Sequence, residues 1–421
     1  MSASLRLSPS AAALGPLHPG TTVFVPGMSG ESLAFFEALA RDPERTDGVT
    51  FVGVHFPGVN RGDYLGLHPS VRQRAYFMSP ALRDGLSTGR VDLLPLDYPG
   101  IVRDLGRLCP IDVAVAQVSP PDEHGMCSLG VSQDFLPSVW NSAKFRIVHV
   151  NPRLPRTRGS FAVHAADCDV AFESDSPIPT LQDETPDTGA LHHAALVASL
   201  IEDGDTLQFG IGRLQAAVLG SLRNHRRLRV YSGMVSGQVI PLLDAGAIDG
   251  ADAVECGVAL GNEAFYARLD RDPTFFFRPA AETHDIRRIA AIENFCAINS
   301  AVEVDLFGQV NVDSLNGRLV AGVGGLPAFA AGAQLSPGGR SIVMVTATGD
   351  KGRASRIVCA APGRPLIALP RHAADIVVTE YGAAHLRDRT VPQRAHALIS
   401  IAAPEFRDAL AEQWRDVERR L

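Results

Sequence analysis

Short apolar runs alternate with segments of helical spacing along most of the chain. The apolar runs lie at residues 49–54, 111–116, 227–231 and 342–345. Between such runs, apolar residues recur every three or four positions, as at residues 31–39 and 214–219. Strands that are apolar throughout and separated by helices are typical of parallel sheets covered on both faces. The pattern therefore predicts an α/β fold with mostly parallel sheets.

The same pattern indicates an internal duplication. Residues 20–27 read as a turn, a short apolar strand and a glycine-bearing loop, and the helical stretch 31–39 follows. Residues 204–212 repeat this arrangement before the helical stretch 214–219. Each copy has the form of the opening of a βαβ unit, although a chance match of turn and helix signals is the alternative. We predict two related, doubly wound α/β domains.

A Pro-rich and acidic segment without periodicity, residues 174–189, is the best candidate for a linker. A chain of 421 residues also exceeds what one hydrophobic core usually supports. We therefore place the domains at residues 1–187 and 188–421, with a ligand expected in the crevice at the carboxyl ends of their strands. Residues 390–421 read as a packing helix with Pro404 at a probable N-terminal turn.

Composition excludes several classes of function. The apolar fraction is 46%, the charged fraction is 20% and the net charge is -7, which gives no electrostatic basis for nucleic acid binding. The six cysteines are scattered without the paired spacing of zinc or redox sites, so they read as small buried thiols and we expect no metal. No apolar run is long enough for a signal peptide or a membrane span. We expect a cytoplasmic protein, and the sequence leaves open whether it forms a homo-oligomer.

Two glycine-bearing segments are candidates for ligand binding. Residues 322–325 contain three glycines, so backbone N–H groups can approach a ligand and donate to a developing oxyanion. The loop at residues 346–358 combines glycines with Lys351, Arg353 and Arg356, which suits the binding of phosphate groups. A purely structural turn and a solvated basic loop are the respective alternatives.

The first half of the chain contains one distinctive segment, residues 118–132. It reads as a strand, a turn fixed by two prolines and an Asp side chain, and a return strand. Within it, His124 is a candidate general base. A histidine in such a turn more often faces solvent, so we interpret His124 as a surface turn residue.

Several segments in order resemble the acetyl-CoA hydrolase/CoA-transferase family. They are residues 118–132, 209–212, 297–305, 322–325, 336–343, 346–358 and 378–382. The resemblance runs from about Thr22 to Phe406 and includes the 4-hydroxybutyrate and butyrate:acetate CoA-transferases. It implies an acyl-CoA substrate, CoA transfer to a carboxylate, and a glutamate that attacks the thioester to form glutamyl-CoA. It also implies that the C-terminal domain binds coenzyme A through Gly210, Gly212, Gly322, Val323, Gly324, Gly325, Lys351, Arg353 and Arg356.

The chain departs from the family pattern where the catalytic glutamate is expected. That position, which we place in the turn after the strand at Val230, is occupied by Gly233. The following residues 234–236 match the family, whereas Leu326 and Ala328 replace polar residues after the glycine turn. Because the losses fall mainly on polar site positions, we predict an atypical, more apolar active site.

Three activities remain open for such a site. The first is CoA transfer to a carboxylate with a substitute for the lost glutamate. The second is hydrolysis or acyl transfer to a non-carboxylate acceptor, aided by an oxyanion turn at Gly324 and Gly325, and the third is acyl-CoA binding without catalysis. Candidate substitutes near Gly233 are the hydroxyl of Ser232 and the carboxylate of Glu263. Glu263 reads more readily as a helix N-terminal residue, and Glu282 reads as a surface loop acid.

Overall fold

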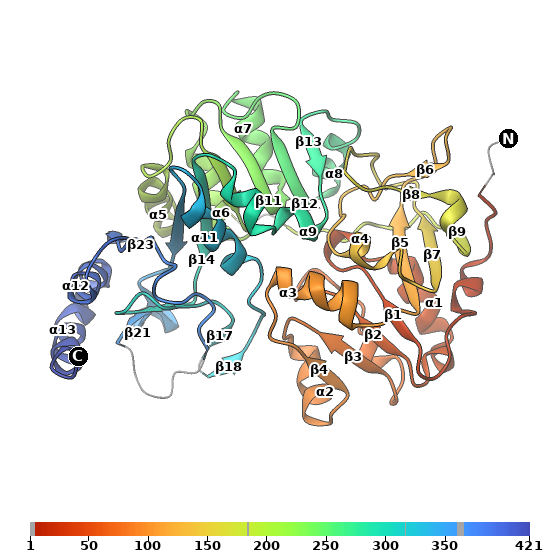
Figure 1. Cartoon of the computed structure of the whole chain (residues 1–421), viewed down its shortest axis with the longest axis horizontal. Coiled ribbons are helices and arrows are strands. Elements are labelled where there is room, and N and C mark those ends of the chain that lie inside the picture. Colours follow the sequence, from red (N-terminus) through yellow and green to blue (C-terminus); the bar gives the residue numbers. More distant parts are fainter. Residues whose placement is uncertain (1–4, 183–184, 316, 360–365) are drawn as a thin grey trace. The chain divides into compact units, whose positions relative to one another are not determined.

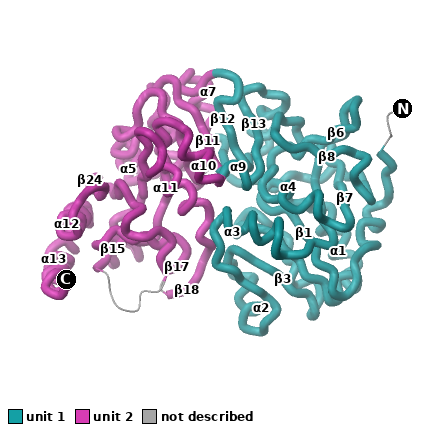
Figure 2. Tube along the Cα trace, in the orientation of Figure 1, with its two compact units in different colours: residues 1–182, 233–237, 250–283 teal, residues 183–232, 238–249, 284–421 magenta. Residues whose placement is uncertain are grey.

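The computed structural model describes residues 5–182, 185–315, 317–359 and 366–421 (Figure 1). The chain divides into two compact units (Figure 2). Unit 1 contains Met1–Gln182, Gly233–Gly237 and Gly250–Thr283, and unit 2 contains Asp183–Ser232, Gln238–Asp249 and His284–Leu421. The continuous domains 1–187 and 188–421 stay a prediction, and Asp183 and Glu184 of the predicted linker lie outside the described residues.

Unit 1 is built on a parallel sheet with the strand order β4-β3-β2-β1-β5-β7-β9. Its strands are β1 (Thr22–Phe24), β2 (Thr50–Val52), β3 (Arg72–Ala75), β4 (Val91–Leu93), β5 (Val113–Val118), β7 (Phe145–Val150) and β9 (Val170–Glu173). Every residue of β5 is buried, as expected for a central strand of a covered sheet. The helices are α1 (Leu33–Arg41), α2 (Arg83–Ser87), α3 (Tyr98–Arg103), α4 (Leu136–Val139), α8 (Glu263–Arg268) and α9 (Ala280–Thr283).

Unit 1 also contains two short strand pairs. One is the antiparallel pair β6 (Met126–Cys127) and β8 (Val163–His164), and the other is the parallel pair β12 (Val254–Leu260) and β13 (Phe275–Phe277). The return strand predicted after the two-proline turn is therefore β6, and its ladder partner is β8.

Unit 2 contains the strand order β11-β10-β14-β19-β23-β24. The strands are β10 (Thr206–Phe209), β11 (Arg229–Ser236), β14 (Phe295–Ser300), β19 (Arg340–Met344), β23 (Ile376–Thr379) and β24 (Gly382–His385). All of these pairs are parallel except β23 with β24. The helices are α5 (Thr188–Ala198), α6 (Arg213–Ser221), α7 (Ile240–Asp244), α10 (Ile286–Ala290), α11 (Leu326–Leu335), α12 (Val391–Ile401) and α13 (Pro404–Glu418).

Unit 2 also contains smaller groups of paired strands. They are β15 (Glu303–Asp305) with β16 (Val310–Asn311) and β22 (Ile357–Val358), the hairpin of β17 (Ser314–Leu315) and β18 (Arg318–Leu319), and the hairpin of β20 (Thr348–Gly349) and β21 (Ala354–Ser355). Residues 390–421 form two helices where the sequence predicted one, and α13 begins at Pro404 as predicted.

Strand order supports the predicted duplication. In unit 1, β1 lies between β2 and β5, and β7 and β9 follow β5. In unit 2, β10 lies between β11 and β14, and β19 and β23 follow β14 in the same way. The structure thus confirms the α/β fold with two mostly parallel sheets. No helix in the described part of the chain is long and apolar enough to cross a membrane.

Candidate active site

The glycine turn at residues 322–325 leads directly into α11. Gly324 has a φ of +68°, which is in the left-handed region that favours glycine. Gly325 is the N-cap residue of α11 and offers no side chain to cap the helix. The N–H groups at the start of a helix carry partial positive charge and attract anions. The binding of a ligand by the backbone N–H groups of this turn stays a prediction.

A buried histidine lies against this turn. A Cβ atom at Gly325 would stand 2.5 Å from Nε2 and 2.8 Å from Cδ2 of His284. His284 is 3% exposed, and its ring packs on Phe329 of α11 with 4.6 Å between centroids. Sequence reasoning passed over His284, because nothing local connects it with a turn so far along the chain. Only the fold shows that residue 325 must be glycine for the imidazole to fit.

Gly210 and Gly212 form the loop between β10 and α6. Gly212 has a φ of +104°, so a residue with a side chain would be strained there. Beyond the loop, Gln215 donates from Nε2 to the carbonyl oxygen of Ile298 at 3.2 Å. Its Oε1 is buried without a hydrogen-bond partner among the described residues. This loop lies at the carboxyl end of a parallel strand, where ligands bind in α/β folds.

The three cations predicted to bind phosphate have different environments. Lys351 is exposed at the tip of the β20–β21 hairpin, with Asp350 and Gly352 beside it also at positive φ. Arg353 is exposed and ion-pairs with Asp350 at 2.6 Å. Arg356 packs inward, because a Cβ at Gly349 would stand 2.8 Å from its Nε, and its Nη1 donates to the carbonyl oxygen of Val302 at 2.8 Å. Lys351 is thus exposed to solvent, whereas Arg356 holds the base of the hairpin.

Gly233 lies inside strand β11, so its predicted place in a turn was wrong. The strand continues through Ser236, and Gly233 is half-buried without a positive φ. Within unit 1, a Cβ atom at Gly257 would stand 2.8 Å from the carbonyl oxygen of Gly233. The backbones of Gly233 and Gly257 therefore approach closely. In unit 2 the neighbouring Ser232 is buried, and its Oγ donates to the carbonyl oxygen of Phe209 at 2.9 Å. The hydroxyl proton of Ser232 is therefore used in a hydrogen bond that links β11 to β10.

The carboxylates considered as substitutes have their own environments in unit 1. Glu263 begins α8 with 81% of its side chain exposed, and its nearest cation is Arg153 at 4.0 Å. Glu282 is not the surface loop acid that the sequence suggested, because it lies on α9 and ion-pairs with Arg278 at 2.8 Å. Arg278 also pairs with Glu255. Neither glutamate lies on the strand that carries Gly233.

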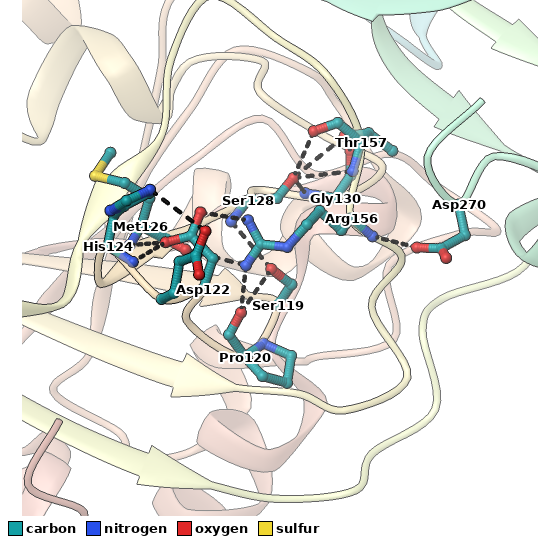
Figure 3. A network of polar contacts seen from close by, with 11 residues as sticks. Ser119, Pro120, Asp122, His124, Met126, Ser128, Gly130, Arg156, Thr157 and Asp270 are labelled. Carbon is teal, nitrogen blue, oxygen red and sulfur yellow. Dashed lines mark hydrogen bonds and ion pairs between the residues drawn. The ribbon is translucent and has the colours of Figure 1, made fainter. Parts of the chain in front are cut away.

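The two-proline turn is held by a network around Arg156 (Figure 3). Asp122 Oδ1 accepts the backbone N–H groups of His124 and Met126, each at 2.9 Å. These bonds, that from Met126 foremost, lower the pKa of Asp122. Arg156 donates from Nη2 to the carbonyl oxygens of Pro120 and Met126 at 2.6 and 3.0 Å. His124 is 79% exposed, which confirms its interpretation as a surface turn residue.

The loop that follows this turn braces β12 within unit 1. The N–H of Gln133 donates to the carbonyl oxygen of Gly257 at 3.0 Å, and the carbonyl oxygen of Val131 accepts from Ala259 at 2.8 Å. Gly257 is the residue whose backbone approaches Gly233. This loop therefore has a structural role beside Gly233.

Comparisons with known proteins identify the family of the chain. Profiles of the acetyl-CoA hydrolase/transferase N-terminal and C-terminal domains match residues 7–182 and 261–414. The 4-hydroxybutyrate coenzyme A transferase of Clostridium kluyveri is 35% identical over 92% of both chains. The chain belongs to the acetyl-CoA hydrolase/transferase family. Its resemblance to the CoA-transferases, stated from the sequence, is confirmed.

Solved structures that are similar to this chain have the same fold. RipA from Yersinia pestis is similar with a TM-score of 0.91 and 27% identity, covering 98% of each chain. The 4-hydroxybutyrate CoA-transferase of Porphyromonas gingivalis is similar with a TM-score of 0.80 and 30% identity, covering 99% of this chain and 98% of that one. The predicted site residues stay predictions, since these comparisons test the fold and the family.

Proposed function

We propose that the protein transfers coenzyme A between an acyl-CoA and a carboxylate by direct attack of the acceptor, without a glutamyl-CoA intermediate on residue 233. Membership of the CoA-transferase family supports the substrates, and curated relatives such as the Clostridium kluyveri transferase support the reaction. The observation that carries the altered mechanism is Gly233, which provides no nucleophile where the family resemblance places one. We expect it to act in the cytoplasm.

The chemistry of direct transfer balances without an enzyme carboxylate. An oxygen of the acceptor carboxylate attacks the thioester carbon, and the C–S bond breaks to give a mixed anhydride and the CoA thiolate. The thiolate then attacks the acceptor's carbonyl carbon, and the original acyl group leaves as a carboxylate. No proton is gained or lost overall. The protein must bind both substrates together, exclude water and stabilise the oxyanions.

Two elements of unit 2 suit these tasks. The turn at residues 322–325 offers backbone N–H groups at the start of α11 to the thioester oxygen. The exposed Lys351, on a hairpin tip with consecutive left-handed residues, offers charge and backbone donors to the phosphates of coenzyme A. Leu326 packs in the hydrophobic core of unit 2, and Ala328 is buried on the same helix.

The test is a product assay with isotope-labelled acetate and butyryl-CoA. We expect labelled acetyl-CoA to form, and CoA release in the absence of any acid to be much slower. Intact-mass analysis after incubation with butyryl-CoA alone should show no covalent adduct. An adduct on Glu263 or Glu282 would contradict direct transfer, with the variants Glu263→Gln and Glu282→Gln as controls. Rapid CoA release without an acid would instead establish hydrolysis, and binding without turnover would make the protein a non-catalytic acyl-CoA-binding protein.

A further inference from the structure

We propose that a cavity of unit 1, beside strands β2 and β3, binds a small carboxylic acid with an apolar body, and that this acid is the acceptor of the transfer. The assignment as acceptor rests on the proposed function. The cavity has a volume of about 340 Å³. Small-molecule sites typically measure about 300–1,000 Å³, so the cavity suits a small ligand.

The cavity lies where ligands bind in parallel sheets. β2 ends at Val52 and β3 ends at Ala75, and the two strands pair in parallel (Figure 1). The lining comes from residues 53–63, which follow β2, and from residues 73–82, which end and follow β3. Ligands of α/β folds bind outside the carboxyl ends of the strands. All of these residues belong to unit 1, so the cavity forms within that unit.

Arg61 supplies a positive charge at the rim of the cavity. It is exposed, and its guanidinium forms no ion pair or hydrogen bond with any residue that the structure describes. In contrast, Arg72 and Arg74 of β3 pair with carboxylates. A guanidinium binds a carboxylate through two parallel N–H donors. Arg61 is therefore suited to the charged end of an acid.

Two polar side chains fix the loop that carries Arg61. Glu31 is 0% exposed, and its Oε2 accepts the backbone N–H of Arg61 at 3.3 Å and the Nδ2 of Asn60 at 3.0 Å. Asn60 Oδ1 accepts the N–H groups of Phe56 and Met28 at 2.7 and 3.0 Å. These bonds tie the loop after β2 to the loop after β1. A loop held in this way loses little entropy when a ligand binds.

The inner wall of the cavity is largely apolar. Tyr76, Phe77 and Leu82 line it and are buried. Phe56 packs on Phe77 with 5.1 Å between ring centroids. The hydroxyl of Tyr76 donates to Asp104 Oδ2 at 2.7 Å, so the polar end of this side chain is already used. The body of a ligand can therefore bury apolar surface here while its carboxylate stays at the rim.

Other ionisable groups of the lining leave room for one negative charge. Asp63 lies against Gly66, and its Oδ1 accepts the N–H of Gly66 at 3.0 Å. Burial lowers the pKa of His55, so its imidazole is neutral near pH 7. One available guanidinium matches a carboxylate, whereas a phosphate dianion would need further cations.

The first experiment is calorimetric titration of the full chain with hexanoate at low salt, without CoA. Hydrogen bonds to charged groups are worth about 10–100-fold in Kd, so we expect a loss of this size in Arg61→Gln. Arg61→Lys keeps the charge and should lose less. Arg41→Gln is the matched control, because Arg41 is exposed and pairs with Glu37 outside the cavity. All three variants should keep the wild-type Tm.

Further compounds test the chemistry of the ligand. Hexanamide has a similar body without the charge, and it should bind the wild type about as weakly as hexanoate binds Arg61→Gln. From acetate to hexanoate, Kd should fall about threefold for each methylene that is buried. Inorganic phosphate should not compete with hexanoate. Ala81→Trp changes an exposed residue of the lining and should block hexanoate binding without lowering Tm.

Kinetics test the role as acceptor site. With butyryl-CoA as donor, the KM for hexanoate should rise in Arg61→Gln by the same factor as Kd, and the KM for butyryl-CoA should change by less than about twofold.

The outcomes separate the two proposals. A wild type that binds hexanoate no better than hexanamide, or unchanged hexanoate binding in Arg61→Gln or in folded Ala81→Trp, overturns the binding site. A wild type that binds hexanoate through Arg61 but transfers no CoA contradicts the proposed function and supports the site. Transfer with the same KM for hexanoate in Arg61→Gln and the wild type overturns the acceptor role.

Discussion

Alanine at position 325 tests how closely the imidazole of His284 approaches the glycine turn. Gly325 has a φ of -87°, so alanine adopts the same backbone without strain. Its Cβ would stand 2.5 Å from His284 Nε2 and 2.9 Å from Phe329 Cε2, both inside van der Waals contact. Because both rings are buried, they must shift at a cost of about 1–3 kcal/mol, the usual range for overpacking.

The assay for Gly325→Ala combines thermal unfolding with steady-state kinetics. A cost of this size lowers Tm by roughly 2–12 °C for a domain of 150–250 residues. If the glycine turn binds the thioester oxygen, moving its backbone N–H groups by about 1 Å should lower kcat by up to about 10²-fold. In Gly325→Ala/His284→Ala the clash with the ring disappears, so the second substitution should relieve part of the Tm loss. Wild-type Tm and kcat in Gly325→Ala, or strictly additive Tm losses in the double variant, would refute the predicted contact.

Three further predictions use other parts of the structure. Gly233→Glu places a glutamate where the family resemblance expects one, at a strand position without positive φ. We expect faster transfer from butyryl-CoA to acetate, and a folded variant without a gain contradicts the idea of a lost nucleophile. Lys351→Ala should raise the Kd for coenzyme A about tenfold, measured by calorimetry, and leave Tm unchanged. Arg356→Ala should instead lower Tm, because Arg356 packs at the base of the hairpin. The reverse result would contradict a ligand-binding role for Lys351 and a structural role for Arg356. Burial raises the pKa of Asp134 to about 7, so the folded state binds its proton more tightly and stability should fall as pH rises from about 4 to about 7. Asp134→Asn should remove this fall, worth up to about 4 kcal/mol, and an unchanged pH profile of Tm would contradict it.

Much of the fold could be predicted from the sequence, because the patterns that indicate strands, helices and turns are local. Apolar runs, glycine loops and helical spacing predicted β2, β5, β11 and β19, and the shared strand order agrees with the predicted duplication. The end of β11 was missed, since Ser232 and Gly233 are poor strand formers that local propensity assigns to a turn. Pairing with neighbouring strands outweighs that propensity.

The site was predictable only in part, for a physical reason. A glycine turn is visible as glycines, but the group that requires the glycine is not, and His284 reaches Gly325 only through the fold. Charge counting likewise treated Lys351 and Arg356 alike, although one is exposed and the other packs against Gly349. Burial and long-range contacts separate functional from structural side chains, and neither can be read from spacing.

Initial-rate kinetics test the central claim of direct transfer most directly. Butyryl-CoA and acetate are varied together, and the pattern of double-reciprocal lines is recorded. A mechanism without a covalent CoA intermediate requires both substrates on the protein at once, so the account predicts intersecting lines for the wild type. Parallel lines, the kinetic signature of a ping-pong mechanism with a covalent intermediate, would contradict it.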